Sequence, residues 1–329
     1  MKRTVWTEDG VELIEAEPDA LRPGWARLRV AACGICGSDL HVWHMPASER
    51  GPCTPGHEIC GTVEQGPAGL ADALYAVEPY KSCGKCDACK RGEGPLCARM
   101  GLFGFQYHGG FAEYVDVPVE RLHPVRGIDR SPLAALAEPT AVAVRGCNIG
   151  RFSRGEQILV VGAGTIGLLS GLVARERGAR VSITARYPHQ ANAAKALGLE
   201  PVGERELEEF TADAKPFCVI ETVGGSGAAL RQAIAATASG GRVVLLGISA
   251  EVTLNLMEVV GREVDLLGSL MYGDPEGRSE FAEGVRILEE HAAELEPLLT
   301  HEFPLVQVED GFLAALDKNS GALKVSITA

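Results

Sequence analysis

The stretch from Gln157 to Gly167 reads QILVVGAGTIG and joins a short apolar run to a glycine-rich turn. The turn has the spacing G-x-G-x-x-G, and residues 168–177 after it have a helical pattern. This motif alone is weak evidence, but a strand before it and a helix after it give it meaning. The stretch therefore predicts a dinucleotide-binding unit.

Each glycine of the turn has its own expected role. Gly162 permits the tight turn, Gly164 lets the backbone approach a pyrophosphate, and Gly167 allows the helix to pack closely on the strand. The pyrophosphate is expected at the positive N-terminus of the helix, where Thr165 and Ile166 lie. The alternative is a glycine-rich turn with a purely structural role.

The end of the next strand indicates which dinucleotide binds. An acidic residue about 20 positions after the turn would accept hydrogen bonds from the ribose of NAD. The chain instead has Ala185, Arg186 and Tyr187 there, so no carboxylate repels a 2′-phosphate and Arg186 can pair with one. The sequence favours NADP(H) over NAD(H), with an ordinary surface arginine as the alternative.

Three segments of the chain differ in their pattern of apolar and turn residues. Residues 155–272 alternate short apolar runs (157–161, 179–184, 217–220 and 242–246) with helical segments, which predicts a doubly wound parallel sheet covered on both faces. Residues 1–130 have short alternating segments broken by turn residues, as expected of a β-rich domain. The tail has helical patterns at 278–295 and 308–316 and a strand at 324–328. It could complete the parallel sheet or return to the first domain.

Four of the ten cysteines lie within fifteen consecutive residues, at Cys83, Cys86, Cys89 and Cys97. Four thiolates on one short loop suit structural zinc, whose closed tetrahedral shell leaves no position for a substrate. Four unrelated buried thiols, or an iron–sulfur cluster, are the alternatives. Nothing in the sequence points to export, so we do not expect disulfides.

A second set of metal-binding residue types is dispersed along the chain: Cys36, His57, Glu58 and Glu138. One thiolate, one imidazole and one or two carboxylates make a mixed shell with room for water, as a catalytic zinc needs. Taken singly, each residue has an ordinary structural reading; Cys36, for example, could form a redox pair with Cys33. The combination favours metal.

Composition limits the partners. The 329 residues are 46% hydrophobic and 23% charged, enough to bury two cores. The net charge of −13 is unlike that of a general nucleic-acid binder or of a protein that adheres to anionic lipid. No apolar run approaches the roughly 20 residues needed to cross a bilayer, and the first residues do not resemble a signal segment. We expect a soluble cytoplasmic protein.

The ordered motifs resemble those of the zinc-dependent medium-chain alcohol dehydrogenases, in the branch of sorbitol, polyol and threonine dehydrogenases. The resemblance covers nearly the whole chain and is carried by the segments 34–41 (GICGSDLH) and 55–58 (PGHE), the four-cysteine loop, Glu138-Pro139 and the glycine-rich turn. Glu138 stands where the liver-type enzymes carry a cysteine, which favours the polyol-type branch. Ala185-Arg186 resembles the corresponding pair of NADP-using ketose reductases.

The resemblance implies a GroES-like β-rich catalytic domain (1–150 and 275–329) interrupted by a Rossmann dinucleotide-binding domain (151–274). It implies that Cys36 and His57 bind the catalytic zinc together with Glu58 or Glu138. Asp39 would orient His57, Ser38 would touch the substrate hydroxyl, and His41 would lie further along a proton path.

We therefore expect a dehydrogenase with two zinc ions per chain that uses NADP(H) to interconvert a secondary alcohol and its ketone, such as a polyol, sugar or cyclitol. Trp43, Phe103 and Tyr107 are candidates for lining the cleft, with burial in the core as the alternative. We also expect a homodimer or homotetramer. The rival interpretations are an NAD-linked polyol or threonine-like enzyme and a nucleotide-binding protein without catalytic activity.

Overall fold

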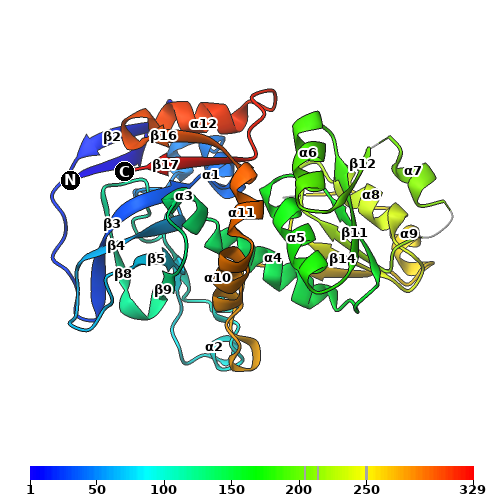
Figure 1. The fold of residues 1–329 in the computed structure, drawn as a ribbon, viewed down its shortest axis with the longest axis horizontal. Helices are drawn as coiled ribbons and strands as arrows, with labels where there is room; N and C mark the ends of the chain where they lie inside the picture. Colours follow the sequence, from blue (N-terminus) through cyan, green and yellow to red (C-terminus); the bar gives the residue numbers. More distant parts are fainter. Residues whose placement is uncertain (204, 213–214, 249–250) are drawn as a thin grey trace. The chain divides into compact units, whose positions relative to one another are not determined.

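The computed structural model describes residues 1–203, 205–212, 215–248 and 251–329 (Figure 1). The chain divides into two units, Met1–Glu138 with Gly273–Ala329, and Pro139–Tyr272. The first boundary lies at 138 rather than at 150, because helix α4 (Ala137–Gly150) packs mainly with the second unit. Within that unit Gly146 lies against the Leu246 side chain, and the Cys147 thiol contacts the Ser170 carbonyl at 3.5 Å.

The first unit is built on a seven-stranded sheet in the order β16-β17-β3-β4-β5-β9, with β8 also paired to β3. Every pairing is antiparallel except that of β16 with β17. The strands are β3 (Trp25–Gly34), β4 (Glu58–Gln65), β5 (Leu74–Val77), β8 (Tyr114–Pro118), β9 (Leu122–Val125), β16 (Leu299–Pro304) and β17 (Lys324–Thr328).

The C-terminal tail returns to this sheet. Ser326 and Ile327 of β17 pair with Gly34 and Cys33 of β3, so the last strand lies beside the segment that leads into Cys36. The helices of this unit are α1 (Gly37–Trp43), α2 (Asp87–Lys90), α3 (Ser131–Ala134), α10 (Glu280–Glu290), α11 (Ala292–Leu295) and α12 (Val308–Leu316). Two small two-stranded antiparallel sheets, β1 (Lys2–Trp6) with β2 (Val11–Glu15) and β6 (Tyr80–Lys81) with β7 (Gly101–Leu102), complete it.

Aromatic side chains fill the core of the first unit around Phe312 of α12, which is fully buried. Its ring meets Trp6 and Phe111 edge-on, each at 5.6 Å between centroids, and stacks on Trp43 at 5.2 Å. The expectation that Trp43 lines a cleft is therefore not supported, because its ring packs on Phe312 and against Gly10. Phe103 is likewise fully buried.

The second unit is a six-stranded, all-parallel sheet in the order β12-β11-β10-β13-β14-β15. Its elements in chain order are β10 (Gln157–Val161), α5 (Thr165–Glu176), β11 (Arg180–Ala185), α6 (Pro188–Ala196), β12 (Glu200–Gly203), α7 (Leu207–Phe210), β13 (Cys218–Glu221), α8 (Ala228–Ala236), β14 (Arg242–Leu245), α9 (Leu256–Val260) and β15 (Asp265–Gly268). The predicted combination of a β-rich domain with a doubly wound parallel sheet is confirmed.

The strand order reverses between β10 and β13. In open parallel sheets, ligands bind outside the carboxyl ends of the strands at such a point. The carboxyl end of β10 is where the turn 162–167 begins, and the carboxyl end of β13 leads into Thr222. In the described residues no helix is long and apolar enough to cross a membrane.

Candidate functional site

Helix α1 positions the first predicted residues. Cys36 is its N-terminal cap, and the Cys36 backbone N–H donates to Asp39 Oδ2 at 2.9 Å. Asp39 is buried, with only 1% of its surface exposed, whereas Ser38 is half-buried. His41, in the last turn of the same helix, is exposed. The short helix thus sets Cys36, Ser38 and Asp39 beside one another.

His57 precedes β4 and faces this helix. Its Nε2 lies 3.3 Å from Ser38 Oγ, and its Nδ1 lies 3.7 Å from Asp39 Oδ1. Burial lowers the pKa of His57, but the charges of Asp39 and Cys36 outweigh burial, so the pKa is raised well above its ordinary value. Nδ1 is buried without a hydrogen-bond partner in the described part of the chain. The Asp39 carboxylate therefore lies on the Nδ1 side of the imidazole, and Ser38 lies on the Nε2 side.

Glu58, the next residue, faces a different partner. Its carboxylate forms an ion pair with Lys324 of β17, and these two side chains are 1% and 3% exposed. Lys324 Nζ also donates to the Ile35 carbonyl at 3.0 Å. Burial lowers the pKa of Lys324, but Glu58, together with the charges of Cys36 and Glu138, outweighs burial and raises it. A Cβ atom at Gly34 would collide with the Glu58 carboxylate, so glycine is required there.

Glu138 lies in the first turn of α4 and is 5% exposed. Its negative charge raises the pKa of both His57 and Lys324. Cys36, His57 and a carboxylate form a donor set that suits zinc with an open position. Their ligand atoms converge less tightly than those of the cysteine cluster described next.

Cys83, Cys86, Cys89 and Cys97 place their sulfur atoms within 4.8 Å of one another. Among residues the structure describes, this is the one group of three or more metal-binding side chains that converges so closely. Backbone N–H groups of Lys85 and Cys86 lower the pKa of the Cys83 thiol to about 5, which favours the thiolate that binds metal. The cluster fits a closed tetrahedral zinc site.

The glycine-rich turn lies at the carboxyl end of β10. Gly162 has φ +104° and its N–H donates to Thr184 Oγ1 at 2.8 Å. Gly167 lies against the Gly162 carbonyl, leaving no room for a Cβ atom. Gly164 caps α5 without a side-chain hydrogen bond and has open space where a Cβ would be. A helix N-terminus that points its N–H groups into open space fits a pyrophosphate.

The end of β11 carries the other predicted cofactor residues. Arg186 is exposed, next to the half-buried Ala185, and its guanidinium lies 5.6 Å from the centre of the Tyr187 ring. The backbone N–H groups of Arg186 and Tyr187 both donate to Gln190 Oε1, at 3.1 and 3.3 Å, which fixes this turn. In the described part of the chain Arg186 forms no ion pair with a carboxylate.

Sequence reasoning missed two residues beside the site. Lys324 gave no signal, because a single lysine in a C-terminal strand ordinarily points to solvent. Phe105, whose ring centroid lies 5.8 Å from that of His57, follows Phe103, which was proposed for the cleft and is instead buried. Both contacts depend on pairing between distant segments.

Comparison with protein families gives two matches. Residues 22–127 match the alcohol dehydrogenase GroES-like domain, and residues 165–290 match the zinc-binding dehydrogenase domain. L-Galactonate-5-dehydrogenase of Escherichia coli K12 is 31% identical over 99% of this chain and 96% of that protein. An L-threonine 3-dehydrogenase of Rhizobium etli CIAT 652 is 30% identical over 96% of this chain and 93% of its own length.

Solved structures of dehydrogenases are similar to this chain over its whole length. An alcohol dehydrogenase of E. coli CFT073 in complex with NADH has a TM-score of 0.88 and 26% identity, covering 100% of this chain and 99% of its own. A protein of Sinorhizobium meliloti 1021 solved with NADP has the same TM-score and 25% identity, with both chains covered completely. The resemblance found in the sequence is confirmed, and the chain belongs to the zinc-dependent medium-chain alcohol dehydrogenase family, whose members are oxidoreductases of alcohols.

Proposed function

We propose that this protein is a zinc-dependent dehydrogenase that transfers hydride between NADP(H) and a secondary alcohol or ketone of the polyol, sugar or cyclitol class. The placement of Ser38 Oγ at 3.3 Å from His57 Nε2, beside Cys36, is the observation that carries the proposal. A hydroxyl next to the metal-binding face of an imidazole can contact the oxygen of an alcohol substrate. The galactonate dehydrogenase relative supports a polyhydroxylated substrate.

The proposed roles follow from these contacts. Zinc bound by Cys36, His57 and a carboxylate would polarise the substrate oxygen and lower the pKa of its hydroxyl. Ser38 would take up the proton of that hydroxyl while passing its own proton on along the path, and Asp39 would keep the His57 ring oriented. His41 is exposed in the last turn of α1, and an imidazole there can pass the proton to solvent near neutral pH.

Of the two candidate carboxylates, we assign the zinc to Glu138 rather than Glu58. The Glu58 carboxylate is already held by Lys324 over Gly34. Turning it toward the metal would leave a buried ammonium without its partner, which is costly. Glu138 is buried, its charge raises the pKa of His57, and it is the remaining carboxylate of the predicted set.

The four cysteines would hold a second, structural zinc. Their loop is attached to the C-terminal part of the same unit, because the Asp274 backbone N–H donates to the Gly92 carbonyl at 2.7 Å. A closed four-sulfur site fixes this loop and does not take part in the reaction.

The preference for NADP(H) rests on Arg186. An exposed guanidinium at the end of β11, with alanine before it, can form charge-assisted hydrogen bonds with a 2′-phosphate. Residues Gly162, Gly164, Thr165, Ile166 and Gly167 would hold the pyrophosphate, and Ala185 and Tyr187 would lie beside the adenosine ribose.

The proposed macromolecular partner is a second copy of the chain. Strand β15 is the last of the parallel sheet, and the adjacent α9 exposes Leu256, Met257 and Val260, each at least 66% exposed. An unpaired edge beside apolar side chains supports self-association.

The first prediction concerns activity. NADPH oxidation and NADP reduction, measured over polyols, sugar acids, ketoses, cyclitols, L-threonine and simple secondary alcohols, should show turnover with at least one polyhydroxylated compound. Cys36→Ser should lower kcat/KM by at least about a hundredfold, since loss of even an outer partner of a metal ligand costs roughly 10–100-fold. Cys53→Ser, a half-exposed cysteine outside both metal sets, is the control. Turnover that survives Cys36→Ser unchanged contradicts the proposal.

The second prediction separates the two carboxylates. Glu138→Gln should weaken binding of the catalytic zinc by roughly 10–100-fold in competition with a chromophoric chelator. Glu58→Gln should instead lower the free energy of unfolding by about 3–5 kcal/mol, because Lys324 becomes a buried unpaired charge. Adding Lys324→Met to Glu58→Gln should restore most of that stability. If zinc binding is lost in Glu58→Gln and kept in Glu138→Gln, the assignment is reversed.

The third prediction concerns the cofactor. Wild-type protein should bind NADP(H) about ten- to a hundredfold more tightly than NAD(H), the equivalent of roughly 1.5–3 kcal/mol for charge-assisted hydrogen bonds. Ala185→Asp with Arg186→Leu should reverse the preference in fluorescence titrations. Arg180→Leu, at the opposite end of the same strand, should leave it unchanged. Tighter binding of NAD(H) by the wild type would show that Arg186 does not select the cofactor.

A further inference from the structure

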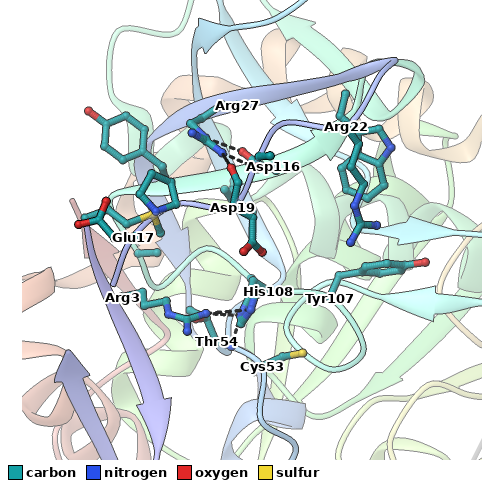
Figure 2. A pocket seen from close by; sticks show the side chains of 18 of the residues that line it. Arg3, Glu17, Asp19, Arg22, Arg27, Cys53, Thr54, Tyr107, His108 and Asp116 are labelled. Carbon is teal, nitrogen blue, oxygen red and sulfur yellow. Dashed lines mark hydrogen bonds and ion pairs between the residues drawn. The ribbon is translucent and has the colours of Figure 1, made fainter. Parts of the chain in front are cut away.

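A pocket in the first unit lies apart from the predicted zinc and cofactor residues (Figure 2). It has a volume of about 290 Å³ and is lined by side chains from the N-terminal strand, residues 17–22, residues 53–54 and the loop 106–109. None of the residues assigned above to zinc, the cofactor or the proton path lines it. The volume is at the low end of the range for small-molecule sites.

One end of the pocket carries hydrogen-bond donors without acceptors. Thr54 is fully buried, and its Oγ1 has no hydrogen-bond partner among the described residues. Arg3 Nε is also buried there without a partner. A buried polar group left unpaired costs free energy, so an acceptor that a ligand brings to this end of the pocket would stabilise both groups.

His108 leaves the charge of Arg3 uncompensated. Arg3 Nη1 lies 3.0 Å from Nδ1 and 2.8 Å from Nε2 of His108, and the Thr54 backbone N–H donates to Nδ1 at 3.0 Å. Burial, followed by the charge of Arg3, lowers the pKa of His108, which favours the neutral form of this ring. In the described part of the chain Arg3 forms no ion pair with a carboxylate.

The opposite charge stands beside these donors. Asp19 and Glu17 line the pocket, and Figure 2 shows the Asp19 side chain extending toward His108. Arg27, which also lines the pocket, is already paired with Asp116 at 2.7 and 2.8 Å. Arg27 also donates to the backbone carbonyl of Asp19, which leaves the Asp19 carboxylate directed into the pocket.

We propose that this pocket binds a free α-amino acid in its zwitterionic form, with its carboxylate on Arg3 and Thr54 and its ammonium group on Asp19. An α-amino acid carries both charges on one carbon, which matches an unpaired guanidinium and a carboxylate lining one small hollow. A simple anion would be repelled by Asp19 and Glu17, and a simple amine would leave the Arg3 and Thr54 donors unpaired. The site is independent of the proposed dehydrogenase reaction.

The test uses the zinc-loaded full-length protein without nicotinamide cofactor, titrated with glycine, L-alanine and L-leucine by ligand-observed NMR. L-Lactate and isopropylamine are the matched analogues of L-alanine, each lacking one of its two charges. At least one amino acid should bind saturably, and L-alanine should bind at least about ten times more tightly than either analogue, as expected for a charge-assisted contact.

Four variants locate the binding. Arg3→Gln and Asp19→Asn should each weaken it at least about tenfold. Arg278→Gln, an exposed arginine elsewhere in the same unit, should bind as the wild type does. Cys36→Ser, which removes a proposed catalytic zinc ligand, should also keep full binding, and this separates the pocket from the dehydrogenase site.

Three results would overturn the proposal. One is no saturable binding of any of the three amino acids up to about 50 mM, well above the millimolar range of weak ligands. Another is binding of L-lactate or isopropylamine as tight as that of L-alanine, which would make the pocket a simple ion site. The third is binding that is lost in Cys36→Ser and kept in Arg3→Gln, which would place the amino acid at the catalytic site.

Discussion

The buried ion pair between Glu58 and Lys324 is the contact on which the arrangement of the site depends. It joins residues 266 positions apart, one at the start of β4 and the other at the start of the last strand. Both side chains are almost fully removed from solvent, so each charge is tolerable only because the other is present. Lys324 also bonds the carbonyl of Ile35, the residue before Cys36. The end of the chain therefore helps to hold the segment that leads into Cys36. The second unit is thus an insertion in the sequence of the first unit.

The two halves of the proposed chemistry are built in different ways. The proposed pyrophosphate site is local, since one strand, one turn and one helix N-terminus would supply it within residues 157–167. The proposed zinc site is assembled from three separate segments, which carry Cys36, His57 with Glu58, and Glu138. A fourth segment, β17, supplies the positive charge of Lys324 beside them. Ser38 and Asp39 contact opposite nitrogens of His57, so one short helix both orients the imidazole and presents a hydroxyl beside it. Because the two proposed sites are built from different segments, the substrate site can change while the cofactor site is retained. The relatives named L-galactonate-5-dehydrogenase and L-threonine 3-dehydrogenase, whose substrates differ in class, agree with this.

How well the sequence predicts each part depends on how local that part is. The cysteine cluster and the turn after β10 could be predicted because spacing along the chain determines their geometry. Lys324 could not, because its role exists only when β17 pairs with β3. Strands β12 and β15 were also missed, since Glu200–Gly203 contains Pro201 and Asp265–Gly268 has only two strongly apolar residues, both half-buried. The position of Trp43 could not be predicted either. Its ring stacks on Phe312, and this contact, like that of Lys324, forms only when the C-terminal tail returns to the first unit.

The proposed chemistry requires two zinc ions of different kinds in one unit, a closed one among four sulfurs and an open one with mixed ligands. Crystals of the active protein, grown without added zinc, can be measured by anomalous diffraction at the zinc edge. Two peaks per chain are expected. One lies among Cys83, Cys86, Cys89 and Cys97, with Zn–S distances of about 2.3 Å. The other touches one sulfur and one imidazole, with its nitrogen and oxygen ligands at about 2.0–2.2 Å. A single peak among the four cysteines in fully active protein would contradict the account, as would a second peak away from Cys36 and His57.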